Sequence, residues 1–123
     1  MFDHVGVNVS DYGASRAFYE PTLQALGYTV QMDFADWKAA GFGTDGKPSF
    51  WIAEREPTGT GTHVAFACEN RLLVDAFHAA AIAAGGRDNG RPGIREEYHE
   101  HYYGAFVLDP DGNNVEAVCH RPA

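Results

Sequence analysis

The sequence lacks three features that would assign it to a membrane, to secretion or to nucleic acid. Its 123 residues contain no apolar run long enough to span a bilayer. The chain passes from Met1 straight into an alternating, strand-like segment, without the basic and apolar regions of a signal peptide. Basic residues are few and scattered: nine Lys and Arg stand against 17 Asp and Glu, a net charge of −8. Nucleic acids and anionic membranes bind a concentrated basic face, so neither is an expected partner. We expect a soluble, cytoplasmic protein.

Cysteine is also scarce, because the chain contains only Cys68 and Cys119. Both lie in strand-like apolar runs, where a free thiol packs as a small hydrophobic side chain. A disulfide is not expected in a reducing compartment, and two cysteines alone do not make a structural zinc site. Hydrophobic residues, by contrast, make up 45% of the sequence. This content suffices for the core of one compact domain spanning residues 1–123.

The segment from Asp109 to His120 predicts a tight turn followed by a strand. Pro110 presets the backbone φ angle of the turn, and Gly112 tolerates a positive φ. Apolar residues then alternate at the strand period of two. Glu116 is the one carboxylate within this apolar run. Because an unpaired buried carboxylate is costly, Glu116 needs a cation, a proton or the rim of a cleft.

Hydrophobic periodicity divides the chain into two halves with the same order of elements. The first half predicts a strand (2–9), a helix (11–26) and three strands (28–34, 37–42 and 49–54). Pro21 is expected to end the first part of that helix near Glu20. The second half predicts a strand (62–68), a helix (70–84), a loop containing Gly and Arg, and strands near 102–108 and 114–119. The first half thus has one strand, one helix and three further strands, and the second half has the same order with the loop in the place of one of those strands.

A shift of 59 residues superimposes the two halves. The shift aligns three pairs in strand, helix and helix end: His4 with His63, Phe18 with Phe77, and Gly27 with Gly86. Three coincidences at a single offset, together with the shared element order, indicate an internal repeat.

The repeat and four segments, HVGVNV (4–9), ASRAFYEPTLQALGY (14–28), THVAF (62–66) and AFVLDPDGNNVEAVCH (105–120), resemble the vicinal oxygen chelate superfamily. That superfamily includes glyoxalase I, extradiol dioxygenases, fosfomycin-resistance thiol transferases and bleomycin-binding proteins. The resemblance implies an α+β fold of two βαβββ modules, at about residues 1–56 and 60–121. It further implies that the sheets curl into a half-barrel cleft that holds a metal ion. A shared fold does not fix the reaction, which depends on the residues of the site.

The resemblance implies a metal site made by His4, His63 and Glu116. The two histidines occupy equivalent positions in the repeat, and Glu116 lies on the last strand of the second module. Two imidazoles and one carboxylate leave open positions on a divalent ion, as a Lewis-acid catalyst requires. The expected cofactor is one divalent ion, which could be zinc, nickel, manganese or iron.

One position departs from glyoxalase I, in which the last strand of the first module supplies a fourth ligand, a glutamate. Here that strand is SFWIAE (49–54), and the equivalent residue is Phe50 or Trp51. The sequence therefore predicts three ligands and a partly aromatic pocket, with Phe50 and Trp51 contacting the substrate. A His, His and Glu ligand set resembles the fosfomycin-resistance enzymes. No counterpart of their phosphonate pocket or potassium loop is found in the sequence.

The segment 95–103 is rich in histidine and tyrosine and leads into the strand before Asp109. His99, His101 and Tyr102 are the candidate catalytic groups, because imidazole and phenol can transfer protons or donate hydrogen bonds to an oxyanion. Which of them faces the cleft stays open. Strand parity puts Tyr102 and Phe106 on one face, and we expect Phe106 to contact substrate. Asn8 shares a face with His4 and is a further candidate for substrate binding.

Three functions remain open at this stage. The first is a metal-dependent lyase or isomerase that acts on a small substrate with two adjacent oxygens. The second is a ferrous extradiol-type dioxygenase, and the third is a non-catalytic protein that sequesters a small, partly aromatic molecule such as a drug or antibiotic. Uncovered sheet edges predict a homodimer. The sequence leaves open whether the cleft forms within one chain or across that dimer.

Overall fold

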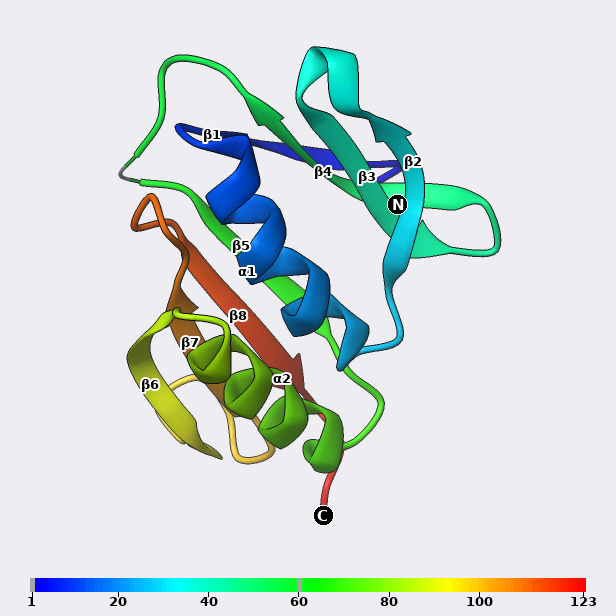
Figure 1. Cartoon of the computed structure of the whole chain (residues 1–123). Coiled ribbons are helices and arrows are strands. Elements are labelled where there is room, and N and C mark those ends of the chain that lie inside the picture. Colours follow the sequence, from blue (N-terminus) through cyan, green and yellow to red (C-terminus); the bar gives the residue numbers. More distant parts are fainter. Residues whose placement is uncertain (1, 60) are drawn as a thin grey trace.

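In the computed structural model, which describes residues 2–59 and 61–123, the chain folds into two four-stranded sheets, each with one helix (Figure 1). The first module comprises β1 (Val5–Val9), α1 (Tyr12–Gln24), β2 (Thr29–Phe34), a short 3-10 helix η1 (Ala35–Trp37), β3 (Ala39–Thr44) and β4 (Lys47–Glu54). The second comprises β5 (His63–Ala67), α2 (Arg71–Ala83), β6 (Arg87–Ile94), β7 (Tyr103–Leu108) and β8 (Asn114–Cys119). Neither α-helix in the described part is long and apolar enough to cross a membrane.

The strand order confirms the expected α+β fold of two βαβββ modules. The first sheet has the order β1-β4-β3-β2 and the second has the order β5-β8-β7-β6. The first and last strands of each module are parallel neighbours, and the remaining pairs are antiparallel. Neither sheet closes on itself, so β1 and β5 are both edge strands.

The register identifies which residue of the first module corresponds to Glu116. In the second sheet Ala65 pairs with Glu116, and in the first sheet Gly6 pairs with Trp51. Gly6 and Ala65 are equivalent in the internal repeat, so Trp51 is the counterpart of Glu116. The choice left open by the sequence, between Phe50 and Trp51, is therefore decided in favour of Trp51.

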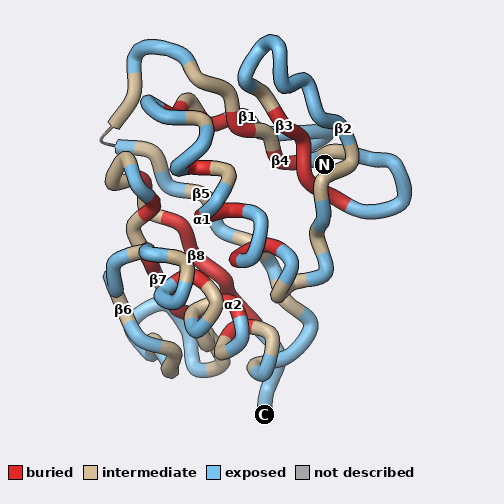
Figure 2. Tube along the Cα trace, in the orientation of Figure 1, coloured by how far each residue is buried: buried red, intermediate tan, exposed pale blue. Residues whose placement is uncertain are grey.

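A single hydrophobic core joins the two modules and lies under both helices (Figure 2). α1 packs on the strands of the first sheet, α2 packs on those of the second, and the helices contact each other. Phe50 lies in this core at 3% exposure, with its ring 5.3 Å from that of Phe66. The expectation that Phe50 contacts substrate is therefore corrected: its side chain points to the helix-covered face, where no ligand on the opposite face reaches it.

The two modules are also joined by a buried polar contact. Tyr19 of α1, which is fully buried, donates its hydroxyl hydrogen to Oδ2 of Asp109 at 2.5 Å. Asp109 accepts further bonds from the backbone of Asp111 and Asn113, which fixes the predicted turn. Burial and the neighbouring Asp109 carboxylate raise the pKa of Tyr19, so this hydroxyl stays protonated and donates its hydrogen bond at neutral pH.

Two local expectations are corrected by the structure. α1 continues through Pro21 instead of ending near Glu20. Pro21 is exposed, and so is Ala17, the residue whose carbonyl oxygen loses its helical partner, so water can replace that bond. The segment expected to be a Gly- and Arg-containing loop forms β6. Its register shifts around Gly90 obscured the alternation that normally reveals a strand.

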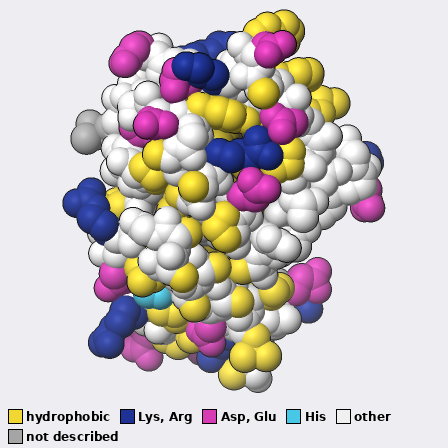
Figure 3. Space-filling view, viewed as in Figure 1, with side chains coloured by type: hydrophobic (Ala, Val, Ile, Leu, Met, Phe, Trp, Pro, Cys, Tyr) yellow, Lys and Arg dark blue, Asp and Glu magenta, His cyan; other side chains and the backbone are white. Residues whose placement is uncertain are grey.

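Cys68 and Cys119 are free thiols, as the sequence predicts. Burial raises the pKa of Cys68 to about 11, so its thiol is protonated and unreactive near neutral pH. Basic and acidic side chains are interspersed on the face of the molecule that Figure 3 shows.

Candidate functional site

Each sheet has one face covered by its helix and one face free of it, and the candidate residues lie mainly on the helix-free faces. In β8, Val115, Ala117 and Cys119 belong to the core, so the intervening Glu116 points the other way. The same alternation puts Tyr102 and Phe106 on this helix-free face, as strand parity predicted. In the first sheet, Phe50 and Ile52 enter the core and Trp51 points to the opposite face.

Glu116 is the centre of the site on the second sheet. Its side chain is 1% exposed, and both of its oxygens are occupied. Oε1 lies 2.8 Å from Nε2 of His63, and Oε2 accepts the hydroxyl hydrogen of Tyr102. His63 is half exposed, at 50% of its side-chain surface, so the pair lies at the boundary with solvent. These contacts supply the partner that a buried carboxylate in an apolar strand requires.

Tyr102 acts as a hydrogen-bond donor in this site. Burial first, and then the hydrogen bond to Glu116, raise the pKa of its hydroxyl well above the ordinary tyrosine value. At neutral pH the phenol is therefore protonated and cannot accept a proton from a substrate. Its contact with Glu116 instead fixes the orientation of the carboxylate, which leaves Oε1 directed at His63.

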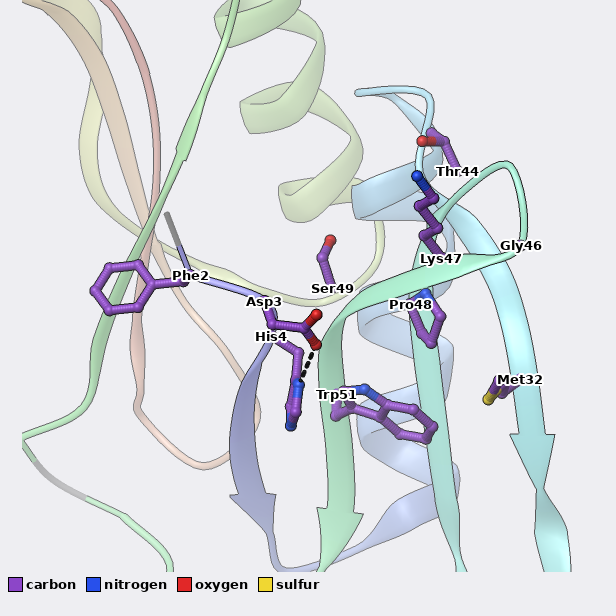
Figure 4. Close-up of a pocket in the computed structure, with 10 residues that line it drawn as sticks. All are labelled: Phe2, Asp3, His4, Met32, Thr44, Gly46, Lys47, Pro48, Ser49 and Trp51. Carbon is purple, nitrogen blue, oxygen red and sulfur yellow. Dashed lines mark hydrogen bonds and ion pairs between the residues drawn. The ribbon is translucent and has the colours of Figure 1, made fainter.

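His4 belongs to the other helix-free face, just before β1. Its Nδ1 lies 2.7 Å from Oδ1 of Asp3, a neighbour that the sequence did not single out. Because a carboxylate only accepts hydrogen bonds, the neutral ring carries its proton on Nδ1 and keeps its lone pair on Nε2. His4 lies beside Trp51 (Figure 4), and both line two adjoining cavities of about 630 and 450 Å³.

The three expected metal ligands are not brought together within one chain. No three His, Cys, Asp or Glu side chains converge on a point anywhere in the described ranges 2–59 and 61–123. His63 and Glu116 meet on the second sheet, whereas His4 lies on the first and pairs with Asp3. The two sheets share one core through their helix-covered faces, which separates the helix-free faces that carry the ligands. Of the two arrangements that the sequence left open, a cleft within one chain does not bring the three ligands together. We call His4 with Trp51 the first half-site and His63 with Glu116 the second half-site.

The two histidines proposed as catalytic groups occupy different surroundings. Nε2 of His99 lies 2.9 Å from Nδ1 of His120, and the ring of His99 packs edge-on against Tyr102. The backbone N–H of His101 donates to Nδ1 of His99, so in the neutral ring the Nε2 of His99 is the donor towards His120. Nε2 of the His101 side chain lies 3.6 Å from Oε1 of Glu100.

His120 was not identified as a site residue from the sequence, whose pattern indicates only the frayed end of a strand. The signal that could have identified it is parity, because His120 is two and four residues beyond Val118 and Glu116 and points to the same side. The ring of His120 lies 5.3 Å from that of Tyr102. His99, His120 and Tyr102 thus form one cluster beside the Glu116 carboxylate.

The structure also gives the surroundings of three of the expected substrate-binding residues. Phe106 lies between the ring of His63, 6.3 Å away, and the guanidinium of Arg95, at 5.4 Å. Asn8 lines the 450 Å³ cavity with His4, and its amide donates to the backbone oxygen of Pro57. Trp51 lines both cavities of the first sheet.

The contact between His63 and Glu116 fits one half of a metal centre. An imidazole nitrogen and a carboxylate oxygen 2.8 Å apart can take neighbouring positions on one ion with bonds of about 2.0–2.2 Å. Tyr102 holds the second oxygen of Glu116, as outer hydrogen bonds commonly do for carboxylate ligands. Nε2 of His4 is suited to the same chemistry, but belongs to the other half-site.

Comparison with known proteins supports the fold and its relationships. The model of the Glyoxalase/Bleomycin resistance protein/Dioxygenase superfamily matches residues 1–117. A solved glyoxalase/bleomycin resistance protein from Albidiferax ferrireducens T118 is 32% identical, with a TM-score of 0.83, and the alignment covers 97% of this chain and 98% of that one. A putative glyoxalase from Bacillus halodurans is 25% identical, with a TM-score of 0.72 and coverage of 97% and 95%. No curated protein matches the chain.

The matched region includes both half-sites, because it extends from before His4 to beyond Glu116. The two βαβββ modules and the register that aligns Trp51 with Glu116 agree with that match. The chain therefore belongs to the Glyoxalase/Bleomycin resistance protein/Dioxygenase superfamily.

Proposed function

We propose that the protein is a metal-dependent lyase or isomerase of this superfamily, acting on a small substrate that binds the metal through two adjacent oxygens. The observation that carries the proposal is the 2.8 Å contact between Nε2 of His63 and Oε1 of the buried Glu116. A divalent ion held there would act as a Lewis acid towards a substrate oxygen. The donor set suits zinc, nickel, manganese and iron alike.

The third ligand, His4, is supplied in this proposal by a second copy of the chain. β1 and β5 are both edge strands, and each flanks one half-site. If β1 of one protomer lies against β5 of its partner, the helix-free faces become continuous and His4 approaches the partner's His63 and Glu116. Such a homodimer also covers two exposed backbone edges, which proteins otherwise protect.

The chain's own residues have separate roles in this proposal. Tyr102 keeps the Glu116 carboxylate in place and donates rather than accepts a proton. Proton transfer then falls to the cluster of His99 and His120, because imidazole is the side chain whose ordinary pKa lies nearest neutrality. His101 is the weaker candidate, since its side chain lies beside Glu100.

Two alternative functions are each favoured by one feature of the chain. Two histidines and one carboxylate also form the ligand set of ferrous oxygenases, which keeps a dioxygenase as the alternative chemistry. The exposed Trp37, at 75%, and its neighbour Trp51 suit a binding protein that holds a small aromatic molecule without converting it.

Calorimetric titration of the chelator-treated protein with zinc, nickel, manganese and ferrous iron tests the proposal. The wild-type protein should bind at least one of these ions. Glu116→Gln should weaken that binding by at least about tenfold, because an amide is a poor ligand for a divalent ion. Glu97→Gln, which changes an exposed carboxylate outside the site, is the matched control and should bind as the wild type does. A wild-type protein without affinity for any of the four ions would reject the metal-dependent enzyme and favour the binding protein.

A further inference from the structure

The helix-free face of the first sheet carries three aromatic side chains where the second sheet has its carboxylate. The rings of Trp51 and Phe34 are parallel to within 5°, with their centroids 6.0 Å apart. Trp37 of η1 adds a third ring, 5.3 Å from that of Phe34. Trp37 is 75% exposed and Phe34 is 40% exposed. We call Phe34, Trp37 and Trp51 the aromatic platform.

Small residues make room for the platform. A Cβ atom on Gly41 would lie 2.8 Å from the indole of Trp51 and 2.6 Å from Pro48, so only glycine lets the indole lie over β3. Figure 4 shows the indole extending from β4 across the neighbouring strand, with Met32 beyond it. Ala39, Ala53 and Gly6 are the small residues in the lining of the 450 Å³ cavity around the rings. A cavity of this size is within the usual range for small-molecule sites.

Among the residues that line this cavity, only basic side chains can carry charge. These residues are Arg55 and His4, and none of the described lining residues is Asp or Glu. This is unusual in a chain with 17 acidic and nine basic residues. Acidic groups lie outside the lining: Asp3 contacts His4, and Asp33 and Asp36 line a separate pocket with Phe34 and Trp37. Arg55 follows Trp51 and Ala53 in strand parity and makes no ion pair with any described residue. Its guanidinium is therefore available to a ligand's anionic group.

We infer that the aromatic platform binds a flat aromatic anion, with the ring system against Trp51 and Trp37 and the anionic group at Arg55. The inference rests on the proposed function in one respect, because it names the substrate class of that same site: the ring lies beside His4, which lines the cavity too. The two modules differ at the position that the repeat makes equivalent. Where the second module has Glu116, the first has Trp51, so one half-site offers a metal ligand and the other an apolar surface.

The experiment uses 2-naphthoate as a probe on the full chain, both as purified and after treatment with EDTA. Both tryptophans of the sequence belong to the platform, so the two indole N–H signals in a proton–nitrogen NMR spectrum report on it directly. We expect both signals to shift on titration, with a Kd of about 1 mM or tighter. Decahydro-2-naphthoate has the same charge without a flat ring, and 2-naphthylmethanol has the ring without the charge. Both should bind more weakly than 2-naphthoate.

Two variants with matched controls locate the site. Trp37→Ala should weaken 2-naphthoate binding about three- to tenfold by removing one stacking ring, and the remaining Trp51 signal should still shift. Arg55→Gln should weaken it by about fivefold or more through loss of the charged hydrogen bond. Tyr98→Ala removes an exposed aromatic ring elsewhere, and Arg121→Gln removes an exposed cation elsewhere; both should bind as the wild type does.

The inference is overturned if neither indole signal shifts, if the saturated acid binds as well as 2-naphthoate, or if Trp37→Ala and Arg55→Gln match their controls. Its failure is distinguishable from failure of the proposed function. In EDTA the platform is measured without metal, whereas the metal titration is measured without an aromatic ligand. Metal binding without 2-naphthoate binding would support the metal centre and overturn the aromatic platform as a binding site. Binding of 2-naphthoate without metal binding would support the platform and reject the metal centre.

Discussion

Glu116 determines the chemistry of the second half-site, because it is a fully buried carboxylate with two specific partners. Its position in an apolar strand is enough to predict that it needs a partner, and the family resemblance, together with the repeat, pointed to His63. Tyr102 could not be identified in the same way. The loop before β7, in which the backbone N–H of Arg95 donates to the backbone oxygen of Tyr102, decides which tyrosine of the segment 98–103 reaches the carboxylate. The sequence of this loop has no hydrophobic periodicity, so it does not show which side chain points inward.

Replacing Tyr102 by phenylalanine should weaken metal binding and lower stability together. Loss of the hydroxyl leaves Oε2 of Glu116 without its donor in a buried position, at a cost of about 1–3 kcal/mol in the free energy of unfolding. Loss of an outer hydrogen bond to a ligand typically weakens metal affinity about 10–100-fold. Urea denaturation and calorimetric metal titration measure the two effects.

Tyr98→Phe is the control for this substitution, because Tyr98 is 60% exposed and its ring lies next to Tyr102. It removes a phenolic oxygen from a neighbouring position and should change neither the metal affinity nor the free energy of unfolding. Equal behaviour of the two variants would mean that Tyr102 does not orient Glu116.

The helices and strands show where sequence patterns succeed and where packing overrides them. Apart from β6 and η1, the order of elements in both modules follows from periodicity, with boundaries within a few residues of those expected. α1 passes through Pro21 because Phe18, Tyr19, Thr22 and Leu23 anchor both of its halves in the core. β6 was missed because Gly90 and Gly93 interrupt its alternation, and only its pairing with β7 makes it a strand. Trp37, expected to begin a strand, ends η1 and so reaches the aromatic platform.

Helix α1 and the turn at Asp109 should unfold together. Tyr19→Phe removes the buried hydroxyl that joins them and should lower the free energy of unfolding by about 1–2 kcal/mol. Asp109 keeps its bonds from Asn113, which limits the loss. Amide hydrogen exchange should become faster in both α1 and the segment 109–113. Faster exchange in α1 alone would contradict a link between the modules at this point.

The whole molecule combines one shared core with two separate half-sites. The internal repeat predicts that His4 and His63 are equivalent, and the structure agrees. Equivalence does not fix how the modules are placed, which is why the sequence could not decide between a cleft within one chain and a cleft across a dimer. Placement depends on which sheet faces pack together, and here the helix-covered faces bury Phe50, Phe66 and Tyr19 in a common core. The completed metal centre therefore requires a second copy in our proposal.

Complementation between two defective variants tests this central claim most directly. His4→Ala and Glu116→Gln chains, carrying two different tags that do not bind metal, are mixed, allowed to exchange subunits and purified through both tags. In a dimer with sites between protomers, each pure variant lacks a ligand in both sites. The mixed dimer has one complete site, because intact His4 comes from one chain and intact His63 and Glu116 come from the other.

We predict that this mixed dimer, at twice the chain mass of 13.4 kDa, binds one divalent ion with nearly wild-type affinity. Each variant alone should bind at least about tenfold more weakly. Metal binding by the mixed dimer that is as weak as that of either variant, or a protein that remains a 13.4 kDa monomer in sedimentation, would contradict a metal centre shared between two chains.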